Sequence, residues 1–136
     1  MDRARQYLAL GRKAGLLITG EENCGAAAET GKARLLLLAA DASPNARKRA
    51  ESFIQGRRAP LLTLPFPKEE LSRLLGRPGC SMVCFTDLAL ARHFASAMAE
   101  ADPEWRPTEE LLLQREEKAR RRKAAPRKHT SGNRRM

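Results

Sequence analysis

Apolar residues form one continuous run in the first third of the chain, from Leu35 to Ala40. Gly31-Lys32 precedes this run and Asp41-Ala42-Ser43-Pro44 follows it. A strand exposed on one face would alternate apolar and polar residues, so a continuous run predicts a strand that is covered on both faces. We therefore expect this strand at the centre of a sheet, with a helix directly after it that Ser43 caps and Pro44 begins.

The rest of the first hundred residues alternates between short apolar segments and helical patterns. Further strands are expected at residues 16–19, 60–64 and 81–86. Amphipathic helices are expected at residues 2–13, 20–31, 44–56, 68–75 and 88–100, the last of them capped by Asp87. Alternating strands and helices in a chain of this length predict a single α/β domain.

A boundary is expected near the only tryptophan, because Pro103 and Pro107 flank it. It divides the chain into a domain over residues 1–102 and a basic extension over residues 103–136. Thr108 is expected to cap a helix that is acidic at its start and basic at its end, as the helix dipole favours. The segment beyond Ala124 has no aliphatic cluster, and we expect it to be disordered in isolation.

Basic residues dominate the charge of the chain, which has 26 Lys and Arg against 16 Asp and Glu, a net charge of +10. From Lys118 onward there are nine basic residues and no acidic one. Such a field favours polyanions, either nucleic acid or an anionic membrane surface. Basic groups also recur along the domain, and aromatic residues are few, which favours contacts with the phosphate backbone over base stacking.

The chain shows no sign of a membrane or secreted protein. Its apolar runs are too short to span a bilayer, and the first residues lack the apolar core of a signal peptide. Three cysteines (Cys24, Cys80 and Cys84) are too few and odd in number for a disulfide framework. We expect a cytoplasmic protein that has no membrane partner.

The sequence offers only weak candidates for catalytic or metal-binding residues. Gly25 and Gly31-Lys32 resemble a phosphate-binding loop, but five residues separate the glycines where the motif has four, and Ala33 stands where it has Ser or Thr. Cys80, Cys84 and His93 do not complete a metal site, and buried cysteines with a surface histidine are the expected interpretation. We therefore predict no catalytic residue, metal, cofactor or small-molecule substrate.

The order of motifs resembles the kink-turn RNA-binding family of ribosomal proteins, and most closely its small bacterial YlxQ-like members. The segments that carry the resemblance are YLALGRKAGLLITGEE, GKARLLLLAADASPN, PLLTLPFPKEELSRLLG and CSMVCFTD. The resemblance covers about residues 5–100. It implies a three-layer α/β/α sandwich with a mixed four-stranded sheet and no catalytic activity. The chain adds a basic C-terminal extension to that fold.

The resemblance also implies which residues contact RNA. The family's glycine at a helix start falls on Gly20, its Asn-Glu pair on Glu22-Asn23, its acidic pair on Ala40-Asp41, its basic residue before the fourth helix on Lys68 and its apolar loop on Cys80-Ser81-Met82. Two positions differ, because Glu22 places a carboxylate near phosphates and Ala26 lacks the family's lysine. The predicted RNA-binding residues are Gly20, Glu21, Glu22, Asn23, Lys32, Asp41, Lys68, Cys80, Ser81, Met82, Arg120, Arg121, Arg122 and Lys123.

Three functions follow from these observations. The leading hypothesis is a non-enzymatic protein that binds structured RNA, such as a kink-turn, and is ribosomal or ribosome-associated, with ribosomal proteins as further partners. In the second, an adaptor binds a protein through residues 20–26 and touches RNA only through its basic tail. The third, an enzyme using Cys84 or the Gly31-Lys32 turn, ranks last.

Overall fold

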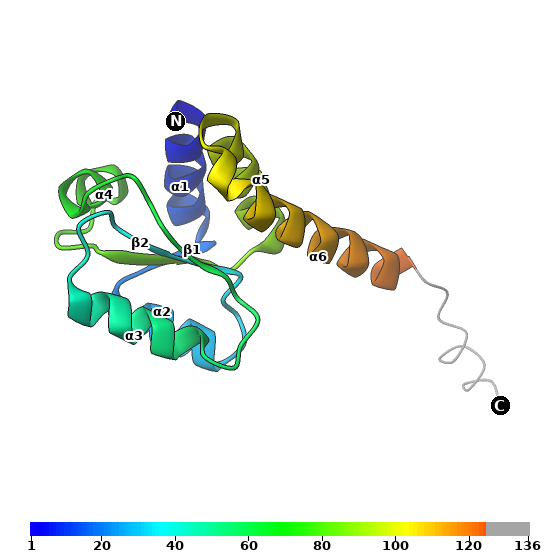
Figure 1. The fold of residues 1–136 in the computed structure, drawn as a ribbon, viewed down its shortest axis with the longest axis horizontal. Coiled ribbons are helices and arrows are strands. Elements are labelled where there is room, and N and C mark those ends of the chain that lie inside the picture. Colours follow the sequence, from blue (N-terminus) through cyan, green and yellow to red (C-terminus); the bar gives the residue numbers. More distant parts are fainter. Residues whose placement is uncertain (125–136) are drawn as a thin grey trace.

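The computed structural model describes residues 1–124 and contains six helices, one 3₁₀ turn and a four-stranded sheet in that range (Figure 1). The helices are α1 (Asp2–Ala14), α2 (Glu21–Glu29), α3 (Pro44–Ile54), α4 (Lys68–Leu75), α5 (Leu88–Ala101) and α6 (Arg106–Ala124), with the 3₁₀ turn η1 (Pro103–Trp105) before α6. The strands are β1 (Leu17–Thr19), β2 (Leu35–Leu38), β3 (Leu61–Thr63) and β4 (Met82–Phe85). The expected disorder beyond Ala124 concerns residues outside the described range.

The sheet is mixed and has the strand order β1-β4-β2-β3. β4 runs antiparallel to both β1 and β2, whereas β2 and β3 are parallel. β2 therefore lies in the interior of the sheet, as the continuous apolar run predicts. It ends at Leu38, two residues before the predicted end, although the Ala39 N–H still donates to the Ser81 carbonyl at 2.8 Å.

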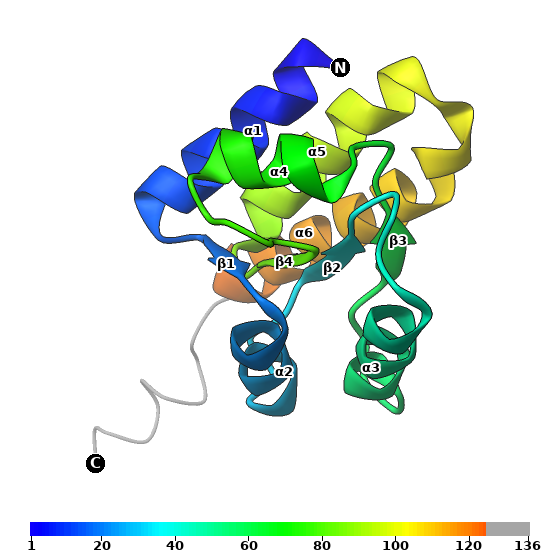
Figure 2. The same cartoon turned by 90° about the vertical axis from the view of Figure 1, so that its left-hand side faces the viewer.

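Helices cover both faces of the sheet and make three layers (Figure 2). On one face, Leu35 and Leu37 pack in a cluster with residues of α1, α4 and α5. On the other, Leu36 and Leu38 pack with Cys24 and Ala27 of α2 and with residues of α3. This arrangement confirms the predicted α/β/α sandwich.

Two predicted helix caps are present. The Ser43 hydroxyl oxygen accepts from the Ala46 N–H at 3.1 Å, and Asp87 Oδ2 accepts from the Leu90 N–H at 2.9 Å. Gly25 lies inside α2, where an added Cβ would come within 2.8 Å of the Phe53 ring of α3. The first glycine of the apparent phosphate loop therefore permits close packing of two helices.

The prediction that Thr108 caps a helix is wrong. α6 begins at Arg106, directly after η1, and the cap of that turn is Asp102, whose Oδ1 accepts from the Glu104 N–H at 3.0 Å. Pro107 fits the first turn of α6, where a backbone donor has no intrahelical partner. Trp105 is buried against Phe94 of α5, with the rings edge to face and their centroids 5.8 Å apart.

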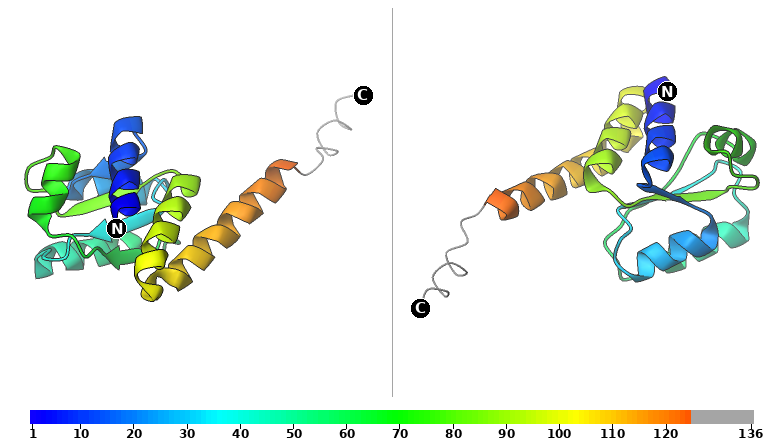
Figure 3. Two further views of the ribbon diagram at one scale, coloured as in Figure 1. Left: turned by 90° about the horizontal axis from the view of Figure 1, so that it is seen from above. Right: turned by 180° about the vertical axis from the view of Figure 1, so that it is seen from behind.

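The first half of α6 packs on the domain. Leu112 is fully buried in the same apolar cluster as α1 and α5, and Arg92 Nε of α5 lies 2.8 Å from Glu116 Oε1. The second half continues past the sheet (Figure 3). Trp105 and Leu112 thus connect the beginning of the extension to the core, while a domain boundary at residue 102 stays a prediction.

Candidate functional site

Most of the predicted contact residues lie at one edge of the sheet. Gly20 follows β1, Asp41 follows β2 and Lys68 follows β3, whereas Ser81 precedes β4. These positions meet because β4 runs antiparallel to its neighbours, so that its beginning lies beside their ends. We call this surface the α2 edge and define it by Gly20, Lys68, Arg77 and Ser81.

Gly20 sets the start of α2 at this edge. Its φ of 97° lies in a region that L-residues rarely adopt, and its N–H donates to the Met82 carbonyl at 2.9 Å. No side chain caps α2, so the amide groups of its first turn have no side-chain acceptor in the described structure. A helix start of this kind attracts anions through its free N–H groups and its dipole.

Acidic residues at the start of α2 are partly neutralised. Glu21 Oε1 lies 3.2 Å from Arg49 Nε of α3, so its carboxylate has a cationic partner. Glu22 is exposed at the second position of the helix. The Asn23 side chain donates to the Thr19 carbonyl at 3.2 Å, which ties the first turn of α2 to the end of β1.

Asp41 holds the loop after β2 against α4. Its Oδ1 accepts from the Lys68 N–H at 2.8 Å, at the first residue of α4. The carboxylate therefore acts as an acceptor for that helix start. This contact fixes Lys68 beside the hollow of the α2 edge.

The hollow at the α2 edge is open, and most of its lining residues are charged or carry a hydroxyl group. Its cations come from α4 and from the loop after it, and its two carboxylates are Glu21 and Glu69. The lining residues are Glu21, Ser43, Lys68, Glu69, Ser72, Arg73, Gly76, Arg77, Pro78, Gly79 and Ser81. Glu69 Oε1 lies 3.8 Å from Arg73 Nη2 on the exposed face of α4.

Sequence analysis missed Arg77 as part of the α2 edge, and Arg73 and Ser43 as residues that line its hollow. A Cβ added to Gly20 would lie 3.6 Å from Arg77 Nη2, so this guanidinium lies beside the start of α2. A signal for Arg77 was present, because it opens the Arg77-Pro78-Gly79 turn directly before the predicted loop Cys80-Ser81-Met82. Gly79 has a φ of 70°, which the turn requires.

Two members of that loop face the core. Cys80 and Met82 are buried, and only the Ser81 side chain between them is partly exposed. Cys24, Cys80 and Cys84 are all free and buried, as predicted. Burial raises the pKa of all three thiols, that of Cys84 to about 11, so they stay protonated and unreactive at neutral pH.

The remaining predicted residues are not at the α2 edge. Lys32 lies before β2, at the opposite edge of the sheet, and Arg120, Arg121, Arg122 and Lys123 lie on the last turns of α6. All five are exposed. The structure therefore distributes the predicted contact residues between two surfaces.

Within residues 1–124, no group of three or more His, Cys, Asp or Glu side chains is placed to hold a metal ion. No helix in that range combines the length and the apolar character needed to cross a membrane.

The first comparison, with solved structures, concerns the fold. A solved structure from Bacillus halodurans C, described as a protein with unknown function, matches 71% of this chain and 96% of its own with a TM-score of 0.64 and 23% sequence identity. This likeness identifies the three-layer fold of the α/β domain. No protein-family model matches the sequence.

A curated protein from Enterococcus faecium, named RNA-binding protein YlxQ, is 33% identical over 77 residues. The match spans 57% of this chain and 74% of that protein. The chain therefore belongs to the YlxQ family.

Proposed function

We propose that this protein binds structured RNA through the α2 edge and catalyses no reaction on it. The RNA is bent, as in a kink-turn, and the protein acts in the cytoplasm as a ribosomal or ribosome-associated component. The name of the Enterococcus faecium relative, which describes an RNA-binding protein, supports RNA as the ligand.

The observation that carries the proposal is the convergence of anion-binding groups at the α2 edge. The uncapped start of α2 supplies backbone N–H groups, and Lys68 and Arg77 add two cations from separate elements. Contacts of this kind fix the position of a phosphate backbone without reading its bases. Because they lie on a helix start, a capped helix and a tight turn, they form a rigid surface that favours one backbone shape.

The side chains at this edge do not favour catalysis. Asp41 serves as a helix cap, Glu21 is paired with Arg49, and Cys80 is a buried thiol whose pKa is raised. Acid–base or nucleophilic chemistry needs a group with a free side chain and a pKa near the working pH. The arrangement supports a binding function.

The experiment compares Lys68→Glu and Arg77→Glu with a matched reversal, Arg106→Glu. Arg106 is exposed at the beginning of α6 and does not line the hollow at the α2 edge. Filter binding measures the affinity of each variant for a kink-turn RNA and for a plain duplex of equal length. Thermal unfolding followed by circular dichroism checks that the variants remain folded.

We expect each α2-edge variant to bind the bent RNA at least about tenfold more weakly and to lose its preference over the duplex, because like charges are placed against phosphates. Arg106→Glu should weaken both RNAs by less than about threefold. If both α2-edge variants keep their preference for bent RNA over the duplex, this edge is not the RNA-binding surface. That result would favour the adaptor hypothesis.

A further inference from the structure

A second cationic surface lies at the opposite edge of the sheet from Gly20. Here α6 passes the segment before β2 and the segment between α3 and β3, and together they enclose about 460 Å³. We call this hollow the α6 groove. Six basic side chains and one carboxylate, Glu29, line it; the basic residues are Arg34, Arg57, Arg58, Arg115, Lys118 and Arg122.

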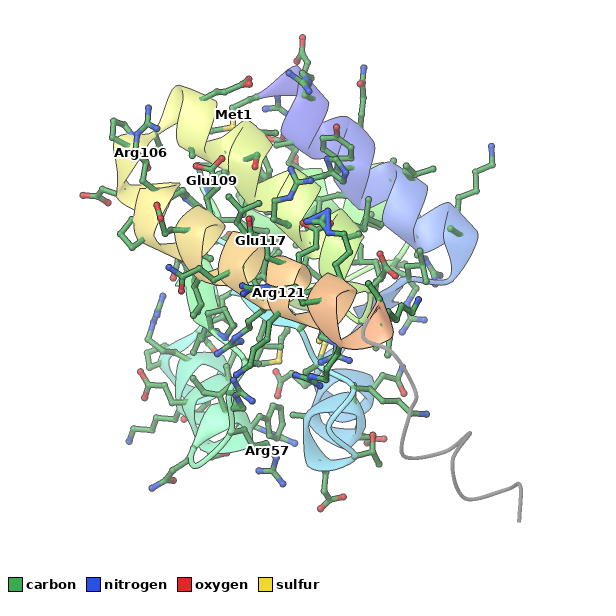
Figure 4. The ribbon with its side chains drawn as sticks, turned by 90° about the vertical axis from the view of Figure 1, so that its right-hand side faces the viewer. Met1, Arg57, Arg106, Glu109, Glu117 and Arg121 are labelled. Atoms are coloured by element: carbon green, nitrogen blue, oxygen red, sulfur yellow. The ribbon has the colours of Figure 1, made fainter. Side chains whose placement is uncertain are left out.

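α6 contributes three of these cations from a single helix face. Arg115, Lys118 and Arg122 are spaced by three and four residues, so their side chains project on the same side. Figure 4 views this side of the molecule, where nitrogen-tipped side chains gather between α6 and the helices α2 and α3. Arg57 lies on the far side of this space from Arg121.

Buried contacts hold this helix face in position. Trp105 and Leu112 anchor the first half of α6 in the core, and Glu116 is paired with Arg92 of α5 only one residue from Arg115. These contacts place Arg115 on the side of α6 where Arg34 and Arg58 lie. A flexible basic segment would not keep such an arrangement.

The cations of the groove outnumber its single described carboxylate, Glu29, by six to one. Among residues 1–124, none of the six cations forms an ion pair with a carboxylate. Burial lowers the pKa of Arg115, and the charges of Arg58 and Arg34 lower it further. Like charges that the fold brings together repel one another, and an anion bound between them reduces this repulsion.

The shape of the groove indicates how such an anion is bound. Its lining includes aliphatic side chains, among them Ala33, Ile54 and Leu88, and none of the described residues that line it is aromatic. Base stacking on aromatic rings is the usual source of affinity for bases, so the groove favours the sugar and phosphate. Arg34 lines the groove, and Asp41 accepts from the Lys68 N–H at the α2 edge. These two residues are seven positions apart in the chain, so their Cα atoms are at most about 25 Å apart.

We propose that the α6 groove binds the phosphodiester backbone of a second, single-stranded segment of RNA, independently of its sequence. The proposal rests on the proposed function, because it assigns the α2 edge to a bent RNA and the α6 groove to a flanking strand. In this arrangement the α2 edge distinguishes bent RNA from a plain duplex, and the α6 groove adds affinity for the flanking strand.

The test uses the full chain with Arg34→Gln, Arg58→Gln and Arg115→Gln combined. The control combines Arg3→Gln, Lys13→Gln and Arg106→Gln, three exposed cations outside both hollows. A third variant carries Arg34→Lys, Arg58→Lys and Arg115→Lys and keeps the charge. The probes are a 20-nucleotide oligouridylate and a kink-turn RNA with and without a single-stranded flank, each measured at several salt concentrations.

We expect the glutamine variant to bind oligouridylate at least about tenfold more weakly at 0.1 M salt. The slope of log K against log salt concentration should also decrease in magnitude by about 2, which is about 0.7 for each of the three lost contacts. The flank should increase the affinity of the unaltered protein and of the lysine variant, but not of the glutamine variant. Discrimination between bent RNA and duplex should stay unchanged, which separates this proposal from that for the α2 edge.

Equal oligouridylate binding by the glutamine variant and its control would overturn the proposal, even with discrimination at the α2 edge intact. Phosphatidylserine vesicles and a polyglutamate peptide serve as competing probes. If the binding of either probe depends on Arg34, Arg58 and Arg115 while the binding of oligouridylate does not, the groove binds a membrane or an acidic protein. The proposal would then be wrong. If the unaltered protein binds none of the RNAs, the proposed function itself fails.

Discussion

Leu36 and Leu38 illustrate how single residues connect the layers of the fold. Both are fully buried on the face of the sheet covered by α2 and α3, whereas Leu35 and Leu37 are buried on the opposite face. A continuous apolar run therefore serves two cores at once. Each side chain in β2 is surrounded by packed neighbours, so truncation leaves a cavity that the structure cannot fully close.

We expect Leu36→Ala and Leu38→Ala each to lower the free energy of unfolding by about 2–5 kcal/mol. Urea denaturation measures this loss, and Leu10→Ala is the matched control because Leu10 is 51% exposed in α1. The control should lose less than about 1 kcal/mol. Losses below about 1 kcal/mol in both strand variants would contradict a central position for β2.

The thiol of Cys84 makes stability depend on alkaline pH. Its pKa is raised to about 11 by burial, so the folded protein keeps this proton over a range where the unfolded chain loses it. Below a pH of about 9 both states are protonated and the contribution is complete; it is lost as the pH rises toward 11. We expect Cys84→Ala to be less stable than the unaltered protein, but with a shallower fall between pH 8 and pH 10.5 in urea titrations.

The same burial predicts slow alkylation of the native protein. Iodoacetamide at pH 7.5 should label Cys24, Cys80 and Cys84 at the rate of unfolding, and label all three quickly in urea, because the thiolate is the reactive form. Mass spectrometry measures the modification. Rapid labelling of Cys84 in the folded protein would restore the hypothesis that it is a reactive group.

Among the elements, α6 differs most from expectation. A helix after Pro107 was predicted, but its connection to the core depends on Trp105 and Leu112, which pack with residues far away in the sequence. Local patterns do not reveal such contacts, because the apolar run Leu111–Leu113 has no partner within its own segment. The structure shows that the middle of this run is buried and its last residue is 40% exposed.

Leu112→Ala and Leu113→Ala form a matched pair in adjacent positions. We expect Leu112→Ala to cost about 2–5 kcal/mol of unfolding free energy and Leu113→Ala less than about 1 kcal/mol. Hydrogen exchange should also increase along α6 in Leu112→Ala, since its anchor is lost. Equal effects in the two variants would show that α6 does not pack on α5 through Leu112.

At the scale of the whole molecule, the two candidate RNA-binding surfaces differ in their balance of charge. The α2 edge contains carboxylates beside its cations, whereas the α6 groove has six cations and one carboxylate. Residues 1–102 have 15 basic and 11 acidic side chains, and residues 103–136 have 11 and 5. We therefore expect the domain to distinguish RNA shapes, and the extension to supply a part of the RNA affinity that decreases with salt.

Two truncations separate the contributions of the extension. Removal of residues 118–136 deletes nine cations, including Lys118 and Arg122 of the α6 groove, but keeps Leu112 and Glu116. We expect it to flatten the salt dependence and weaken all RNAs about equally. Removal of residues 125–136 should have a smaller effect, because the groove stays complete. Loss of discrimination after either truncation, with no effect of Lys68→Glu, would favour the adaptor hypothesis.

The sequence alone determined the features that depend on neighbouring residues. The central strand, the caps at Ser43 and Asp87, and the buried thiols followed from apolar periodicity and capping chemistry. The resemblance to the YlxQ-like proteins added the mixed sheet and the grouping of Gly20, Asp41, Lys68 and Ser81. These features are local, or belong to the family, so a single chain was enough to predict them.

Tertiary structure alone decided which distant residues meet. It placed Arg77 beside Gly20, moved the helix start from Thr108 to Arg106, and brought Arg34, Arg58 and Arg115 around one groove. The physical reason is that these contacts depend on the insertion of β4 between β1 and β2 and on the packing of Trp105 and Leu112. Both are long-range events that no local pattern encodes.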